Sequence, residues 1–355
     1  MSRDALSSII APDRLAWMKE PDMAGLLAEP KTWLVTGCAG FIGSNLVEAL
    51  LRAGQNVRGL DNFATGRQSN LDEVNQLVGQ EAASRFDFLE GDIRDLDTCR
   101  ARTDGTDYVL HQGALGSVPR SLANPIASHE ANVNGTLNIF EASRENGVKH
   151  VVFAASSSTY GDHPDLPKKE DKIGNPLSPY AGTKLINEIY AAIYARNYGQ
   201  KITGLRYFNV FGPRQNPNGA YAAVIPKWLA AMIAGETLKI NGKGDTSRDF
   251  CYVDNAVQAN IKAALLRQTD GFEVFNVAYG QRTSLLELFD ILKSALETRQ
   301  HIYDAPPEHG PYRPGDVRHA LADISNAANA FGYDPNFSIR QGVEDAIGWY
   351  MNHLD

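Results

Sequence analysis

The stretch Thr36-Gly37-Cys38-Ala39-Gly40-Phe41-Ile42-Gly43 joins a short apolar run to a segment with helical character. Gly37 permits a tight turn, Gly40 lets the backbone approach a pyrophosphate, and Gly43 lets the helix pack closely on the strand. The helix start at Phe41 and Ile42 offers N–H groups and a partial positive charge to phosphates. The spacing is GxxGxxG instead of GxGxxG. Because a strand precedes it and a helix follows, it still predicts a dinucleotide-binding turn.

On either side of this turn, short apolar runs alternate with helix-length amphipathic segments. Nearly continuous apolarity in short runs is typical of parallel strands buried on both faces, and alternation with helices indicates right-handed βαβ crossovers. We therefore predict an α/β fold with a Rossmann-type doubly wound parallel sheet and a smaller mixed α/β substrate-binding lobe. The predicted strands are 33–36, 57–60, 86–89, 108–111, 151–155 and 203–207, with 274–278 added to the same sheet later in the chain.

The length of 355 residues is enough for two domains. We predict an N-terminal helical extension at 1–30, a dinucleotide-binding domain at 31–208 that also takes the strand near 273–278, and an interleaved second lobe at 209–355. Within that lobe we expect a short helix at 228–234, a hairpin turn at 241–245 and a long loop at 306–315.

Composition excludes several classes of function. The net charge of −8 argues against a nucleic-acid or anionic-membrane partner. No apolar run is long enough to span a bilayer, and the segment 1–30 does not resemble a signal peptide, so we expect a cytoplasmic protein. The three cysteines show neither metal-ligand nor disulfide spacing, and we predict no metal site. Cys38 is interpreted as a small residue that fills the turn, with an accessible thiol as the alternative.

The ends of the next strands complete the predicted cofactor site. Asp61 ends the second predicted strand, where a carboxylate accepts hydrogen bonds from a ribose diol and repels a 2′-phosphate. Asn62 follows it in place of arginine, which favours NAD over NADP, although Arg67 is near enough in sequence to keep NADP open. The remaining candidates at strand ends are Asp92, Ile93, Gln112, Gly113 and Ala114.

Tyr180 and Lys184 are four residues apart after a helix-start signal at 178–179, so they share one face of a helix. A phenol that acts as a base at neutral pH needs its pKa lowered by about three pH units, roughly 4 kcal/mol. Lys184 and a positively charged nicotinamide are the sources, because nearby cations favour the anion. A hydroxyl of the run 156–158, at the end of the fifth predicted strand, would share the proton path. These features predict Tyr180 and Lys184 as catalytic, together with one hydroxyl of the run 156–158.

Over about residues 31–350, the chain resembles the extended short-chain dehydrogenases/reductases that act on nucleotide sugars. Within that family it is most similar to the UDP-N-acetylglucosamine 4-epimerases of bacterial O-antigen (lipopolysaccharide) synthesis. The phrases that support the resemblance are Asp61-Asn62-Phe63-Ala64-Thr65-Gly66, Gly116-Ser117-Val118-Pro119-Arg120-Ser121, Ala155-Ser156-Ser157-Ser158-Thr159-Tyr160-Gly161-Asp162, Arg206-Tyr207-Phe208-Asn209-Val210-Phe211-Gly212, Thr246-Ser247-Arg248-Asp249-Phe250 and Arg313-Pro314-Gly315-Asp316-Val317-Arg318.

The resemblance implies roles for individual residues. Ser156 matches the proton-path hydroxyl, Tyr180 the base and Lys184 the ribose-binding lysine, so the last two are also cofactor contacts. Tyr207 and Val210 are further implied cofactor contacts. The implied substrate contacts are Ser117, Ser156, Ser157, Ser158, Tyr180, Asn209, Val224, Ile225, Arg248, Arg313, Asp316 and Ala320.

Several of these substrate contacts have a specific implied partner. Asn209 would bind the sugar diphosphate, 224–226 would hold the uracil, and Asp316 would bind the uridine ribose. Arg248 and Arg313 would neutralise the diphosphate with bidentate bonds, which suits an otherwise acidic protein.

The implied activity is reversible C4 epimerisation of UDP-N-acetylglucosamine to UDP-N-acetylgalactosamine, through a 4-keto sugar and transient hydride transfer to tightly bound NAD. Ala320 aligns with the position that limits room at the sugar C2 substituent, and alanine leaves that room open. UDP-glucose, UDP-galactose and uronic forms stay open as substrates. One alternative is a decarboxylase or 4,6-dehydratase of the same family. Dehydration is disfavoured because Ser157 and Ser158 stand where a dehydratase has carboxylates. The other alternative is a non-catalytic NAD sensor. The resemblance also implies a homodimer through a four-helix bundle of helices near 126–146 and 183–198.

Overall fold

The computed structural model describes residues 14–216, 223–268, 270–312 and 318–354. A seven-stranded sheet occupies its centre, and every neighbouring pair of strands is parallel. The strand order is β11-β6-β5-β4-β1-β2-β3, so the direction of winding reverses between β1 and β4. The strands are β1 (Thr32–Thr36), β2 (Asn56–Asp61), β3 (Phe86–Glu90), β4 (Tyr108–His111), β5 (His150–Ser156), β6 (Ile202–Tyr207) and β11 (Phe272–Val277).

This sheet confirms the predicted fold class, including the late strand. β11 pairs with β6 in parallel, although the whole segment 208–271 lies between the two strands in the sequence. The central strands are buried along nearly their whole length, which is why they read as continuous apolar runs.

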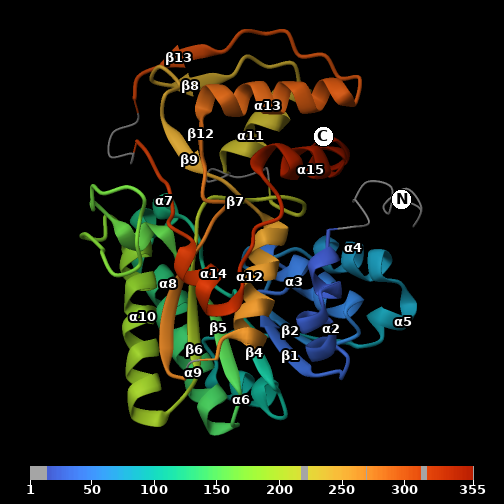
Figure 1. Ribbon diagram of the computed structural model, residues 1–355, viewed down its shortest axis with the longest axis vertical. Helices are drawn as coiled ribbons and strands as arrows, with labels where there is room; N and C mark the ends of the chain where they lie inside the picture. Colours follow the sequence, from blue (N-terminus) through green and yellow to red (C-terminus); the bar gives the residue numbers. More distant parts are fainter. Residues whose placement is uncertain (1–13, 217–222, 269, 313–317, 355) are drawn as a thin grey trace.

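Helices cover both faces of the sheet (Figure 1). On one face α3 packs against β1 and β2, and α12 packs against α3, β5 and β6. On the other face α9 and α10 pack against the sheet and α6 packs on α9. These helices are α3 (Phe41–Arg52), α6 (Leu96–Thr103), α9 (Gly135–Glu145), α10 (Pro179–Tyr198) and α12 (Val253–Leu266).

Shorter elements complete this half of the molecule. The described part of the N-terminal extension forms η1 (Ala16–Lys19) and α2 (Pro21–Leu27), whose Trp17 and Met23 are buried in the core beside α3. Among the described residues, no helix combines the length and apolarity that a membrane crossing requires. The other elements are α4 (Gln68–Val78), α5 (Gln80–Ala83), α7 (Val118–Ala123), α8 (Pro125–His129), the π-helical turn η2 (Glu130–Asn134), η3 (Ser157–Tyr160) and α14 (Ser325–Phe331).

A second hydrophobic core lies in the lobe at the top of Figure 1. Helices α11, α13 and α15 contribute most of it, together with short strands. Both α13 and α15 begin with a capping box, Ser284 with Glu287 and Ser338 with Gln341. The elements are β7 (Val210–Phe211), α11 (Val224–Ile233), β8 (Lys239–Asn241), β9 (Ser247–Asp249), β10 (Cys251–Tyr252), β12 (Arg282–Ser284), α13 (Leu285–Thr298), β13 (Glu308–Gly310) and α15 (Ile339–His353).

The structure corrects three details of this lobe. The predicted hairpin at 241–245 is wrong, because β8 pairs with β13 and β9 pairs with β12. A Cβ on Gly242 would collide with the ring of Tyr312, and one on Gly244 with the side chain of Leu286, so each glycine lies under a different distant segment. The helix predicted from residue 228 begins at Val224. The loop predicted at 306–315 contains β13.

Candidate active site

The glycine turn lies between β1 and α3, at the point where the sheet reverses its winding. Gly37 has a φ of +68°, and a Cβ there would lie 2.8 Å from the Gly113 nitrogen. A Cβ on Gly43 would lie 2.0 Å from the Gly37 oxygen. Glycine is therefore required at both positions by close backbone approach. Gly40 is the N-cap of α3, so the free N–H groups of that helix face the adjoining space.

Cys38 lies inside this turn and is completely buried. Burial, reinforced by the negative charge of Asp61, raises the pKa of its thiol. The interpretation of Cys38 as a small filling residue is confirmed, and the accessible-thiol alternative is wrong.

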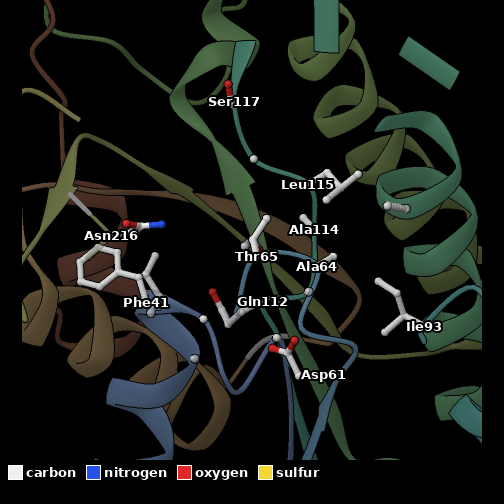
Figure 2. A pocket seen from close by; sticks show the side chains of 18 of the residues that line it. Phe41, Asp61, Ala64, Thr65, Ile93, Gln112, Ala114, Leu115, Ser117 and Asn216 are labelled. Atoms are coloured by element: carbon white, nitrogen blue, oxygen red, sulfur yellow. The ribbon is translucent and has the colours of Figure 1, made fainter. Parts of the chain in front are cut away.

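A cavity of about 620 Å³ opens beside the turn, within the range of roughly 300–1,000 Å³ that is usual for ligand sites. In Figure 2, Phe41 and Ile93 border it on opposite sides, with Asp61 at the bottom of the view and Ser117 at the top. Every residue predicted to contact the cofactor lines it. These residues are Gly37, Gly40, Phe41, Ile42, Gly43, Asp61, Asn62, Asp92, Ile93, Gln112, Gly113, Ala114, Tyr180, Lys184, Tyr207 and Val210.

Asp61 ends β2 and faces this cavity while also bracing the turn. Its carboxylate accepts hydrogen bonds from the N–H groups of Ala39, at 2.9 Å, and Phe63, at 2.8 Å. Burial raises the pKa of Asp61, and these hydrogen bonds oppose the rise. A glycine turn whose Cys38 and Ala39 side chains are buried, a helix N-terminus and a strand-end carboxylate are the features that a dinucleotide needs, so the residues present fit such a cofactor.

His111 is buried beneath the turn instead of lining the cavity. Gly113 donates to Thr36 Oγ1, which contacts His111 Nδ1 at 2.6 Å, and His111 Nε2 contacts Thr136 Oγ1 at 3.0 Å. Thr136 in turn donates to the Asn132 carbonyl, so the network assigns the ring proton to Nε2. Burial and the charge of Lys184 lower the pKa of His111 to about 3. The imidazole is therefore a neutral support for the turn.

The predicted catalytic residues lie together on the far wall of the cavity. Pro179 begins α10, and Ser178 caps it by accepting a hydrogen bond from the Ala181 N–H. This places Tyr180 in the first turn, where its own N–H donates to Ser121 Oγ. Ser156, at the end of β5, accepts a hydrogen bond from Ser158 Oγ at 2.8 Å.

The electrostatics of this trio are set by burial. Burial raises the pKa of the Tyr180 phenol, and a hydrogen bond with Ser156 lowers it. The Lys184 ammonium lies 5.9 Å from the centre of the Tyr180 ring and donates to the Ala154 carbonyl at 2.7 Å. Burial lowers the pKa of Lys184 to about 8, against the opposing charge of Glu188. The phenolate form thus depends on cations strong enough to outweigh burial.

A second cavity of about 330 Å³ lies in the smaller lobe. The predicted substrate contacts Asn209, Val224, Ile225 and Arg248 line it. Asn209 and Val210 line both cavities, so the two spaces meet at the end of β6 and the start of β7. Sequence reasoning missed the remaining wall, which includes Lys239, Trp228 and Phe250.

The other predicted substrate contacts have different surroundings. Ser117 and Ser156 line the first cavity, whereas Ser157, Ser158 and Ala320 are absent from the described walls of both cavities. Ala320 donates its N–H to the Ser247 carbonyl, next to Arg248. Arg313 and Asp316 lie outside the described residues.

Several residues of the first cavity were also missed. Arg94 pairs with Asp92, and its hydrogen bonds lower the pKa of that carboxyl to about 2. Arg120, Arg214 and Asn216 line the wall as well. For Arg214, the run 212–217 with its glycine, prolines and polar residues indicates a loop. Nothing in that run indicates that the loop lies against the cofactor cavity.

A family model described as the NAD dependent epimerase/dehydratase family matches residues 33–278. The chain belongs to this family. NAD is therefore its cofactor, in agreement with the donors and acceptors that the glycine turn and Asp61 present.

Similar proteins cover nearly the whole chain. The UDP-glucose 4-epimerase of Mycolicibacterium smegmatis is 36% identical over 90% of this chain and 98% of its own. The structure of UDP-N-acetylglucosamine 4-epimerase from Methanobrevibacter ruminantium M1, in complex with UDP-N-acetylmuramic acid, is 37% identical with a TM-score of 0.83, over 91% of this chain and 99% of that one. The structure of UDP-glucuronic acid 4-epimerase from Bacillus cereus, in complex with UDP-glucuronic acid and NAD, is 31% identical. Its TM-score is 0.79, over 91% of this chain and 100% of that one.

Proposed function

We propose that this chain interconverts the C4 epimers of a UDP-sugar, with UDP-N-acetylglucosamine and UDP-N-acetylgalactosamine as the preferred pair. One observation carries the proposal: Tyr180 lines the cavity of the dinucleotide turn, and Asn209 and Val210 join that cavity to a second one. A sugar nucleotide whose base occupies the second cavity directs its hexose toward Tyr180. The epimerases among the similar proteins support this arrangement.

In the proposed cycle, the cofactor occupies the cavity beside the glycine turn. Tyr180 removes the proton from the sugar 4-hydroxyl, and Ser156, already hydrogen-bonded to the phenol, shares that proton path. Lys184 favours the phenolate through its positive charge. When bound, NAD⁺ accepts the hydride from C4 and returns it to the opposite face after the 4-keto sugar has turned. Tyr180 then gives its proton back to the new 4-hydroxyl.

The second cavity supports a firm hold on the nucleotide and a looser one on the hexose. Trp228 and Phe250 provide apolar aromatic surface for a uracil ring, and Lys239 and Arg248 provide charge for a diphosphate. The Arg248 guanidinium is oriented by the carbonyls of Ser247, at 3.0 Å, and Arg318, at 3.1 Å. A hexose held mainly through its diphosphate is free to turn between the two hydride transfers.

The preference for an acetylated sugar rests on Ala320. Its backbone is fixed to Ser247, one residue before Arg248, and its side chain is a single methyl group. Ala320 does not belong to the described lining of either cavity, so we infer from the resemblance that a larger residue at this place, reaching beyond the methyl group, would reduce the room for a C2 substituent. The Methanobrevibacter structure, which holds UDP-N-acetylmuramic acid, supports an N-acetylated substrate for this chain as well.

The test is NMR analysis of the products formed from UDP-N-acetylglucosamine, UDP-glucose and UDP-glucuronate. We expect a C4-epimer mixture, fastest with the acetylated sugar. Loss of carbon dioxide from the uronate would indicate a decarboxylase, and loss of water a dehydratase, which the hydroxyls of Ser157 and Ser158 disfavour. The variant Tyr180→Phe should still bind NAD, and its turnover should fall by a factor of about 10²–10⁴. If the unaltered protein turned over none of the three sugars, the NAD-sensor alternative would be favoured.

We further propose that the protein is a homodimer. The helices α7, α8 and α10 pack together, and their outer faces expose Leu122, Ile126, Ile189 and Ile193. Apolar side chains gathered on adjoining helices are typical of a buried helix–helix interface. Sedimentation velocity should therefore give the mass of a dimer, and Ile126→Asp combined with Ile189→Asp should give a monomer.

A further inference from the structure

Three residues of α10 follow one another at intervals of one helical turn: Tyr180, Lys184 and Glu188. Side chains four residues apart lie on one face of a helix, with about 5–6 Å between their Cβ atoms. Lys184 and Glu188 are both buried. The proposed base is therefore followed, along a single helix face, by a buried cation and then by a buried anion.

Glu188 is held by Arg206 of β6 in a bidentate pair. Arg206 Nε donates to Oε1 at 2.9 Å and Nη2 donates to Oε2 at 2.7 Å. Neither side chain is more than 7% exposed, so salt in the solvent screens the pair weakly. Arg206 Nη1 also donates to the Glu170 carbonyl, and the guanidinium lies 4.7 Å from the centre of the Tyr160 ring. Arg206 is thus fixed on several sides.

The pair is linked to Lys184 both along α10, where Glu188 is one turn further on, and across the sheet. Lys184 donates to the Ala154 carbonyl of β5, and the next residue of that strand, Ala155, is in register with Arg206 on β6. Lys184 and Arg206 are therefore two cations on neighbouring parts of one buried layer, with Glu188 in contact with Arg206 and one turn away from Lys184. The net charge that Lys184 experiences depends on both members of the pair.

Other titratable groups around α10 do not replace this influence. His111 of β4 is neutral near pH 7, because burial and the charge of Lys184 lower its pKa to about 3. Ser156 and Ala154 of β5 carry no charge. Further charged or titratable groups lie on the elements packed against α10. Tyr160 of η3 donates to Asn276, and Tyr207 of β6 donates to Gln112. His150 of β5 is neutral near pH 7, because burial lowers its pKa to about 3. On α9, Glu141 pairs with Arg144 and Glu145 pairs with Arg100. Glu130 of η2 pairs with Arg94, and Glu273 of β11 pairs with Arg267. The others are Arg120 of α7 and His129 of α8.

We propose that Glu188 and Arg206 are positioning residues for the reaction: the Glu188 carboxylate keeps the Lys184 ammonium charged and directed along the helix face toward Tyr180, and Arg206 holds that carboxylate in place and limits its effect. The inference rests on the proposed role of Tyr180 as the base. It assigns to β6 a part in the chemistry without any contact between that part of the strand and the substrate.

The two members of the pair have opposite charges, which provides the test. Glu188→Gln removes the anion that raises the pKa of Lys184 and leaves the Arg206 cation without its counter-ion, so the pKa of Lys184 should fall by about one pH unit. Arg206→Met removes the competing cation and leaves the Glu188 carboxylate facing Lys184, so the pKa should rise by a similar amount. The double variant should restore a value near that of the unaltered protein.

The measurement is a pH titration of lysine ¹³Cε NMR signals in protein saturated with NAD⁺, without sugar, with the Lys184 signal assigned by its loss in Lys184→Arg. Glu273→Gln is the matched control, since Glu273 of β11 pairs with another buried arginine, Arg267. It should leave the Lys184 titration unchanged. If either single variant fails to fold, Glu188→Asp, which retracts the carboxylate by one methylene, should lower the pKa in the same direction as Glu188→Gln.

Opposite shifts in the two single variants support the proposal. Shifts in the same direction, or no shift, would overturn it. If the pair were merely structural, the direction of the change in the pKa of Lys184 would not depend on whether the positive or the negative partner is removed. The titration needs no sugar, so its result is independent of which UDP-sugar is turned over. Absence of turnover with normal opposite shifts would count against the proposed function instead.

Discussion

The guanidinium of Arg214 is fully buried against the carboxylate of Glu48, with Nη2 2.6 Å from Oε2. Arg214 also donates to Asn45 on the same helix, α3, and to Glu73 on α4. Glu73 accepts a further hydrogen bond from Trp349 of α15. One arginine on the loop beside the cofactor cavity is therefore bonded to two helices next to the glycine turn, and through Glu73 to the smaller lobe.

Replacing Arg214 with methionine should reduce the free energy of unfolding by about 3–5 kcal/mol, because Glu48 and Glu73 would keep buried charges without their main partner. Denaturant unfolding measures this loss. Arg52→Gln is the matched control: Arg52 pairs with the same Glu48 from a half-exposed position and should cost only about 0–1 kcal/mol. Equal losses in the two variants would contradict the importance of burial.

The same pair predicts a dependence of stability on pH. Burial, the largest influence, would raise the pKa of Glu48, but the charges of Arg214, Arg14 and Arg52 together with the hydrogen bond from Arg214 outweigh it and bring the pKa from the usual 4.5 to about 2. The ionised carboxylate therefore stabilises the fold above pH 4.5, and this contribution is lost as the pH falls toward 2. In Arg214→Met the free energy of unfolding should fall less steeply over that interval. A slope equal to that of the unaltered protein would assign the acid sensitivity to other carboxylates.

Gly43→Ala should abolish NAD binding. The added Cβ would lie 2.0 Å from the Gly37 oxygen, and backbone on both sides prevents a local adjustment. The NAD content of the purified protein and its affinity for added NAD⁺ measure the effect. Gly25→Ala is the control, because the Cβ would meet nothing within 4 Å and the residue lies inside α2. NAD bound normally by Gly43→Ala would refute the close-approach argument.

Ala320→Tyr should shift substrate preference toward sugars without an acetamido group. A tyrosine at this position adds a ring close to Arg248 and reduces the space for a C2 substituent. We expect the ratio of kcat/KM for UDP-N-acetylglucosamine to that for UDP-glucose to fall about tenfold or more, which corresponds to roughly 1.4 kcal/mol. Ala320→Ser, with nearly the same volume, should leave the ratio unchanged. A constant ratio in both variants would remove Ala320 from the specificity argument.

The sheet and the residues that line the cofactor cavity could be predicted from sequence because the patterns that indicate them lie close together in the chain. The strand that ends at Thr36, the glycine spacing and the carboxylate of Asp61 each report a backbone requirement close by in the chain. The hairpin at 241–245 was wrong because a two-glycine turn does not reveal which distant strands pair beside it, and here the neighbours are Tyr312 and Leu286.

The second cavity and the buried ion pairs could not be found in the same way. Trp228 and Phe250 read as ordinary core residues, since apolar periodicity is the same whether a side chain packs on protein or borders a binding site. Arg214 and its partners Glu48 and Glu73 are far apart in the sequence, so their complementarity appears only when the lobes are assembled.

The return of the chain to the sheet at β11 has a consequence for biosynthesis. While the ribosome has released the chain only as far as Phe208, β6 is an open edge whose backbone groups lack a neighbour on one side. The nucleotide half cannot close until Val277 has emerged, by which time α11 and α12 have also been made. A nascent chain of this protein should therefore acquire protease resistance late and in one step, and severing it after Phe208 should yield two fragments that aggregate separately and recover only when mixed.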